Sequence, residues 1–245
     1  MLRLKNLSVS VGEKKIIKNF SFDFQKGKVY VVMGPNGSGK STLSYALMAH
    51  PAYQVHKVVR SIKSKVTQPI ISLNGEDITE LDAQKRAEKG IFLSFQSPLS
   101  LSGVTVFQLL QLALSGTIDP VMLRRKVLST AKELHLSEEL LRRSLNENAS
   151  GGEKKKLEVL QATILDKQVQ IFDEVDTGVD VDALKTIGTF LNKNKKNKTY
   201  IIITHYNRIL KYVKPDEVLV LNNGKLVRTG GASLAKQIER TGYKS

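Results

Sequence analysis

The sequence Val29-Tyr30-Val31-Val32-Met33 runs directly into Gly34-Pro35-Asn36-Gly37-Ser38-Gly39-Lys40-Ser41-Thr42. The first five residues are all apolar, which is typical of a strand buried inside a parallel sheet. The residues from Leu43 to Met48 have the composition and spacing of a helix. A strand, a glycine-rich loop and a helix in this order form the Walker A pattern, and a match at every position argues against a chance Gly/Ser turn.

This loop predicts a site for the phosphates of ATP. Its glycines allow the backbone to curl until successive N–H groups converge on an anion. The N-terminus of the following helix adds the positive end of its dipole. Lys40 is expected to reach the β- and γ-phosphates, and the Ser41 hydroxyl is expected to bind Mg²⁺. We therefore expect residues 34–42 to bind ATP with Mg²⁺, and the chain to hydrolyse ATP.

A second apolar strand, Val169-Gln170-Ile171-Phe172, ends in the acidic pair Asp173-Glu174. Taken alone, such a run is more typical of a plain strand end. Behind a Walker A loop it predicts the Walker B pair. Asp173 would hold Mg²⁺, directly or through water, and Glu174 would polarise the attacking water.

Two further apolar strands end in polar side chains. Residues 90–95 lead to Gln96, whose amide would bridge Mg²⁺ and the attacking water, although Gln96 taken alone is better explained as a turn residue. Residues 199–203 lead to Thr204 and His205. A single His is usually structural, but open α/β sheets place their ligands at the carboxyl ends of strands. We therefore expect His205 to contact the γ-phosphate.

A second anion-binding geometry occurs at Ala149-Ser150-Gly151-Gly152-Glu153, just before an expected helix from Lys154 to Ile164. Ser-Gly-Gly at the start of a helix offers backbone N–H groups to an anion. One nucleotide does not need two such sites within one chain. The two sites therefore predict a dimer, in which each nucleotide lies between the Walker A loop of one subunit and residues 150–153 of the other.

The bulk composition excludes several classes of protein. The chain has 245 residues, of which 41% are hydrophobic and 25% charged, as in ordinary globular proteins. It contains no cysteine, which excludes disulfides and Cys-ligated metals within the chain. No stretch approaches the ~20 apolar residues of a membrane span, and the N-terminus lacks an apolar signal core. We expect a cytoplasmic protein without direct membrane insertion.

The net charge of +15 comes from 38 basic and 23 acidic residues and raises the alternative of nucleic-acid binding. Aromatic residues make up only 6% and do not alternate with the basic clusters, as a base-stacking surface requires. The clusters are Lys57–Lys65, Arg124–Lys126, Lys154–Lys156 and Lys193–Lys198. We interpret them as solvated surface lysines, and a nucleic-acid-associated ATPase is the less favoured alternative.

Taken together, the motifs resemble those of the ATP-binding cassette (ABC) superfamily. Their order is Walker A, Gln96, Ser150-Gly151-Gly152, Asp173-Glu174, the turn Thr177–Asp180 and His205. The resemblance covers nearly the whole chain. It implies an α/β fold, a P-loop NTPase of ABC type, with a RecA-like parallel sheet core, an N-terminal antiparallel β subdomain and a helical signature subdomain. It also implies that Asp180 is the aspartate of the nucleotide-contacting D-loop.

Several strings are similar to one group within this superfamily, the ATPase subunits of the SUF iron–sulfur cluster assembly system. These strings are Ser150–Lys155, Asp173–Lys185, Thr204–Leu210 and Thr241–Tyr243. The similarity implies a head-to-tail, ATP-dependent dimer whose partners are the scaffold proteins SufB and SufD. A nucleotide-binding subunit of an ABC transporter is the alternative.

The expected organisation is a single ABC ATPase domain over residues 1–245. Its catalytic core would comprise residues 1–96 and 161–245, and its helical subdomain residues 97–160. Expected helices span Thr105–Leu114, Pro120–Leu134 and Glu138–Leu145, and strands near residues 2–9, 16–25 and 69–74 would form the antiparallel subdomain. Many ABC ATPases stack adenine on an aromatic residue about where Val11 stands, so we expect only a weak contact with the base.

Overall fold

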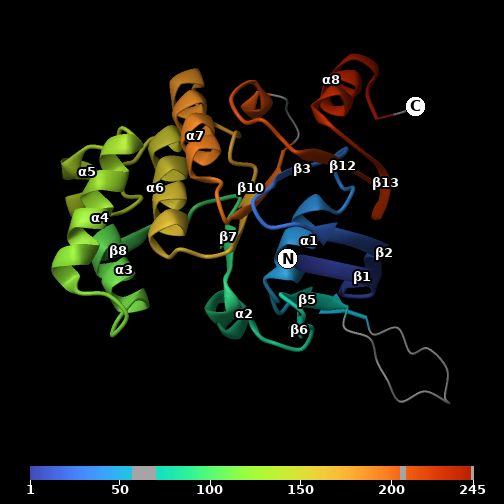
Figure 1. The fold of residues 1–245 in the computed structure, drawn as a ribbon, viewed down its shortest axis with the longest axis horizontal. Coiled ribbons are helices and arrows are strands. Elements are labelled where there is room, and N and C mark those ends of the chain that lie inside the picture. The colour runs from blue at the N-terminus through green and yellow to red at the C-terminus, as the bar shows by residue number, and fades with distance from the viewer. Residues whose placement is uncertain (57–69, 205–207, 244–245) are drawn as a thin grey trace.

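The computed structural model describes residues 1–56, 70–204 and 208–243. Its central sheet has six strands in the order β13-β12-β3-β11-β10-β7 (Figure 1). The neighbouring strands are parallel except for the antiparallel pair β12 and β13. The strands are β3 (Val29–Met33), β7 (Ile91–Ser94), β10 (Val169–Asp173), β11 (Thr199–Ile203), β12 (Glu217–Asn222) and β13 (Lys225–Gly230). The predicted parallel core is confirmed.

Both faces of this sheet are covered. Alternate residues of a strand point to opposite faces, so Val31 of β3 joins one apolar cluster while Val32 joins another. The first cluster includes α6 (Gly151–Ile164) and α7 (Val181–Asn194), and the second includes α1 (Lys40–Leu47). The remaining core helices are α2 (Ala83–Lys89), η1 (Ile209–Lys211) and α8 (Ala232–Thr241). All five residues of β3 are buried, as predicted.

A second, antiparallel sheet packs on α1. Its strands run in the order β2-β1-β5-β6, and β4 also pairs with β1. They are β1 (Leu2–Val11), β2 (Lys14–Phe24), β4 (Tyr53–Val55), β5 (Ile71–Leu73) and β6 (Glu76–Asp77). The predicted antiparallel arrangement of the early strands is confirmed. Apart from β4, most of residues 55–70 lie outside the described part of the chain.

Three helices and a short ribbon form one end of the molecule, far from the C-terminus (Figure 1). They are α3 (Val106–Ala113), α4 (Pro120–Glu133) and α5 (Glu138–Arg142), with β8 (Leu101–Thr105) and β9 (Ser144–Leu145). The helix expected to reach Leu145 ends at Arg142, because Leu145 pairs with Leu101 across the ribbon. No helix among the described residues is long and apolar enough to cross a membrane.

Candidate functional site

The phosphate loop lies between β3 and α1, as predicted. Gly39 precedes α1 in a left-handed conformation, with φ of 103°. A Cβ there would lie 2.7 Å from Ile17 Cδ1, and a Cβ on Gly34 would lie 2.1 Å from the carbonyl oxygen of Leu221. Position 39 therefore requires glycine for its left-handed backbone conformation, and position 34 requires glycine for the close approach of the β12 backbone.

Lys40 is the buried cation of this loop, since only 4% of the residue is exposed. Its Nζ donates hydrogen bonds to the carbonyl oxygens of Gly34 at 2.9 Å and Pro35 at 3.0 Å. Burial lowers the pKa of Lys40 to about 8, and the charges of Glu174 and Asp173 oppose that shift. The ammonium is thus held inside the loop by carbonyls that an anionic ligand would replace as partners.

Asp173, at the end of β10, has the features of a cation ligand. It is 1% exposed, and its Oδ2 accepts a hydrogen bond from Ser44 Oγ at 3.0 Å. Its Oδ1 has no hydrogen-bond partner within the described part of the chain. Burial raises the pKa of Asp173, and hydrogen bonds from Ser44 and Ser41 lower it. A buried carboxylate oxygen without a donor fits Mg²⁺, which proteins hold through one or two carboxylates together with substrate phosphates.

A hollow of about 450 Å³ opens over the loop. Its lining brings Gln96 and Glu174 together with the phosphate loop, as the sequence predicted. The lining also includes Lys14 and Ile16 of β2, which belong to none of the sequence motifs. Their position just beyond the turn at Gly12, next to the expected base contact, could have indicated them. The residues lining the hollow are Lys14, Ile16, Asn36, Gly37, Gly39, Lys40, Ser41, Thr42, Gln96 and Glu174.

Gln96 and Glu174 are in direct contact. Gln96 Nε2 donates to Glu174 Oε2 at 2.8 Å, and Thr177 Oγ1 lies 3.3 Å from the same oxygen. Glu174 has a positive φ of 52°, a conformation that costs a residue with a side chain about 1–3 kcal/mol. This geometry orients the Glu174 carboxylate through the Gln96 amide, the group expected to bridge the metal and the water.

Residues 150–153 are placed by a capping box at the start of α6. Ser150 Oγ accepts from the Glu153 N–H at 3.2 Å, and Glu153 Oε2 accepts from the Ser150 N–H at 2.8 Å. These hydrogen bonds lower the pKa of Glu153. The helix begins at Gly151, three residues before the expected start. None of residues 150–153 lines the hollow over the phosphate loop.

The turn Thr177–Asp180 packs tightly against the start of α6. A Cβ on Gly151 would lie 2.3 Å from the carbonyl oxygen of Gly178, and a Cβ on Gly152 would lie 3.0 Å from Asp180 Oδ2. Asp180 also caps α7, since its Oδ1 accepts from the Ala183 N–H at 2.7 Å. In this chain, the predicted D-loop aspartate therefore has a helix-capping role.

The predicted His205 lies outside the described residues. The residue before it, Thr204, is fully buried, and its Oγ1 donates to Asp176 Oδ2 at 2.6 Å. Asp176 is 1% exposed, and burial raises its pKa. Asp176 lies within the sequence Asp173–Lys185, whose pattern gives it no role of its own. The structure shows that it joins the turn after Glu174 to the end of β11.

One predicted surface cluster is partly buried. Lys155, in the middle of Lys154–Lys156, is 3% exposed, so the prediction of a solvated cluster is wrong at this position. Its Nζ donates to the carbonyl oxygens of Phe95 and Gln96 and pairs with Glu158. A buried ammonium needs such acceptors to replace the water it loses, and the sequence pattern alone does not indicate them.

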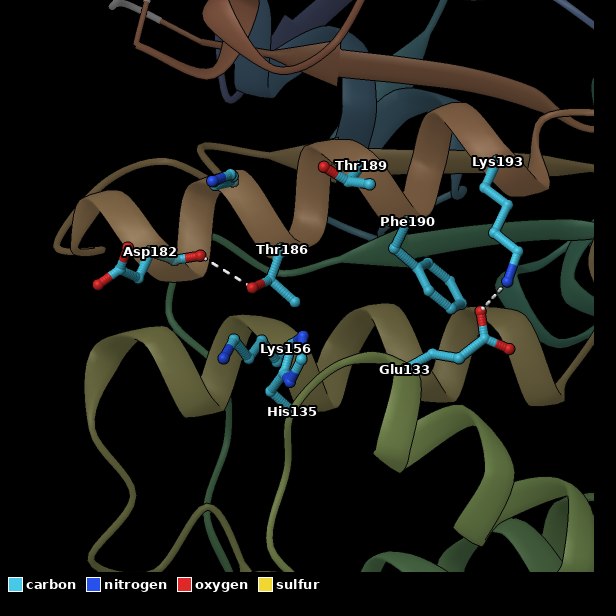
Figure 2. Close-up of a pocket in the computed structure, with 9 residues that line it drawn as sticks. Glu133, His135, Lys156, Asp182, Thr186, Thr189, Phe190 and Lys193 are labelled. Carbon is cyan, nitrogen blue, oxygen red and sulfur yellow. Dashed lines mark hydrogen bonds and ion pairs between the residues drawn. The ribbon is translucent and has the colours of Figure 1, made fainter.

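A larger hollow, of about 620 Å³, lies between α6, α7 and the end of α4 (Figure 2). It is lined by side chains of both charges, and Lys193 Nζ donates to Glu133 Oε2 across it at 2.7 Å. Thr186 Oγ1 donates to the backbone oxygen of Asp182. The lining includes none of the predicted nucleotide-site residues. The larger hollow is therefore separate from the hollow over the phosphate loop.

Known proteins are similar to this chain over nearly its whole length. The family model for ABC transporters matches residues 17–177. The "Probable ATP-dependent transporter SufC" of Escherichia coli (strain K12) is 40% identical over 252 residues, covering 99% of this chain and 97% of that protein. The "Probable ATP-dependent transporter ycf16" of Trieres chinensis is 40% identical over 256 residues, covering 100% of this chain and 96% of that protein.

Solved structures share the fold. A nucleotide-free ATP-binding cassette from an ABC transporter has a TM-score of 0.76 at 25% identity, covering 98% of this chain and 95% of that chain. A dimeric ATP-binding cassette in a post-hydrolysis state, bound to ADP and Pi, has a TM-score of 0.77 at 20% identity, covering 94% of this chain and 98% of that chain. The second likeness concerns the fold alone.

Proposed function

Because the chain belongs to the ATP-binding cassette (ABC) family, we propose that it acts as an ATP-driven dimer whose opening and closing changes the shape of a protein partner. The chain is an ATPase with the P-loop fold predicted from its motifs. The proposal concerns how hydrolysis is carried out and what it serves.

In this proposal the phosphates lie on residues 34–42, with Lys40 against the β- and γ-phosphates. Ser41, Gln96 and Asp173 hold Mg²⁺, which neutralises phosphate charge when bound. Glu174 orients and deprotonates the attacking water, and His205 contacts the γ-phosphate. The unpartnered Asp173 oxygen and the Gln96–Glu174 contact support these roles.

The observation that carries the dimer is the one-sided lining of the hollow. The phosphate loop, Gln96 and Glu174 line it, whereas residues 150–153 do not. We assign those four residues and Asp180 to the nucleotide of a second subunit. ATP then closes the dimer because its phosphates contact both subunits, and hydrolysis opens it.

We propose SufB and SufD as the partners and iron–sulfur cluster assembly in the cytoplasm as the process. Support comes from the strings at Ser150–Lys155 and Asp173–Lys185, and from the name of the Escherichia coli relative. Residues 97–160 would form the helical subdomain that carries residues 150–153 to the second subunit. A transporter subunit is the second candidate, because the names of both relatives include the word transporter. Affinity purification distinguishes the two: a soluble scaffold pair supports the first, and a membrane permease supports the second.

Two variants test the catalytic proposal. Lys40→Ala is expected to lose ATP binding or turnover. Glu174→Gln is expected to bind ATP but to lose turnover by about 10²-fold or more, and to elute as a dimer when ATP and Mg²⁺ are present. Gel filtration and phosphate release measure both properties. Normal turnover by Glu174→Gln would remove Glu174 as the base.

A further inference from the structure

A buried ion pair lies on α6, outside the hollow over the phosphate loop. Lys155 Nζ is 3.1 Å from Glu158 Oε2, and the two side chains are only 4% and 7% exposed. Ser94, the last residue of β7, donates its hydroxyl to the same Glu158 oxygen at 3.0 Å. Removing two charges from water is costly, so such a pair is weak evidence of a purely stabilising role.

Each N–H group of the Lys155 ammonium has a hydrogen-bond acceptor. Besides Glu158, it donates to the carbonyl oxygen of Phe95 at 2.9 Å and to that of Gln96 at 3.1 Å. Three acceptors match the three N–H groups of a lysine. The lysine therefore binds the two residues at which the chain leaves β7, and Glu158 fixes the lysine.

The segment that Lys155 holds is otherwise exposed. Phe95 is 41% exposed, and Gln96 is also exposed. Within the described part of the chain, the Gln96 side chain extends from this segment to Glu174, with 2.8 Å between Nε2 and Oε2. A contact chain thus runs from Glu158 through Lys155 and Gln96 to Glu174.

We propose that Glu158, acting through Lys155, is a positioning residue for Gln96. This inference rests on the proposed roles of Gln96 and of residues 150–153. Helix α6 begins with Ser150-Gly151-Gly152, the residues assigned to the nucleotide of the second subunit. A displacement of α6 on dimer closure moves Lys155, and Lys155 moves the backbone of Gln96 relative to Glu174. The Lys155–Glu158 pair thereby links two events. One is the contact of residues 150–153 with the nucleotide of the second subunit, and the other is the orientation of the attacking water by Glu174 in the first subunit.

The test replaces Lys155 and Glu158 together. In the double variant Lys155→Met/Glu158→Leu, apolar side chains of similar size occupy the site, a change that is often neutral or stabilising. Lys154→Met, on the adjacent half-buried lysine, is the matched control, and Gln96→Ala is the reference for loss of the amide. Steady-state ATP turnover and thermal melting are measured on the full chain.

We expect the double variant to fold and to keep its KM for ATP, since neither residue lines the hollow. Its kcat should fall about 10- to 100-fold, because a misplacement of about 1 Å in a reacting geometry costs up to about 10²-fold. Wild-type kcat in the double variant together with a reduced kcat in Gln96→Ala would overturn this inference and leave the proposed function standing. Wild-type kcat in Gln96→Ala would overturn both the inference and the role of Gln96.

A second variant tests the proposal even if the double variant fails to fold. Glu158→Gln keeps the size of the side chain and an acceptor for Ser94, but removes the charge that fixes Lys155. Backbone amides at residues 95–97 should exchange hydrogen at least about twofold faster than in the wild type, while those of β10 stay unchanged. Unchanged exchange at residues 95–97 would contradict the positioning role.

Discussion

The helix that carries the phosphate loop is anchored at its far end by one arginine. Arg86 of α2 is 1% exposed, and its Nη1 donates to the last carbonyls of α1, Ala46 at 2.8 Å and Leu47 at 2.9 Å. Its Nε donates to Leu81 at 3.0 Å, and its Nη2 donates to Thr79 at 2.7 Å. Burial lowers the pKa of Arg86 to about 10, so it remains protonated at neutral pH.

Arg86→Ala removes all four hydrogen bonds. At about 1 kcal/mol net for each, the free energy of unfolding falls by about 4 kcal/mol. For a chain of this size, that corresponds to a melting temperature lower by about 8–16 °C. Arg86→Lys keeps the charge but loses the planar fork, and about half of the effect is expected.

Thermal melting followed by circular dichroism measures the change. The control is Arg142→Ala, whose side chain is 73% exposed beside Glu138 and whose loss should shift the midpoint by no more than about 2 °C. A midpoint for Arg86→Ala that matches that of the control would refute the anchoring role.

Three further predictions follow from the site. Asp173→Asn should raise the Mg²⁺ concentration for half-maximal turnover at least about tenfold, and an unchanged titration would argue against Asp173 as a ligand. Gly34→Ala should lose about 1–3 kcal/mol of stability and weaken ATP binding, because its Cβ would lie 2.1 Å from the Leu221 carbonyl; retained affinity and stability would contradict the close approach. Asp176, whose pKa burial raises, disfavours folding when ionised. Asp176→Asn should therefore be more stable than wild type above the folded pKa, with the gain vanishing as pH falls to the ordinary Asp range; a gain that grows on acidification would reverse the sign.

The sequence correctly predicted the parts of the site whose conformation depends on residues that are neighbours in the chain. The apolar run of β3 and the loop up to Thr42 have one physical interpretation, and the structure has the same strand, loop and helix. The positions of Gln96 and Glu174 could also be predicted. Both residues follow a parallel strand, and the carboxyl ends of parallel strands lie at one edge of the sheet.

Long-range partners determine what the sequence could not predict. Lys155 lies in a run of three lysines and Arg86 in a polar stretch, and both patterns are typical of solvated helix faces. Arg86 can be buried because carbonyl oxygens about 40 residues away accept hydrogen bonds from its guanidinium. The end of α5 at Arg142 likewise depends on a strand partner, Leu101, distant in the sequence.

The contact between Gly151 and Gly178 changes how genetics on this protein should be interpreted. A side chain at position 151 would press on its own subunit's turn and, in the dimer that we propose, on the neighbour's nucleotide. In a dimer with this substitution in only one subunit, both active sites would therefore be impaired. Complementation between a Gly151 variant and a Lys40 variant should therefore fail, whereas two defects confined to the same centre would leave the other centre intact.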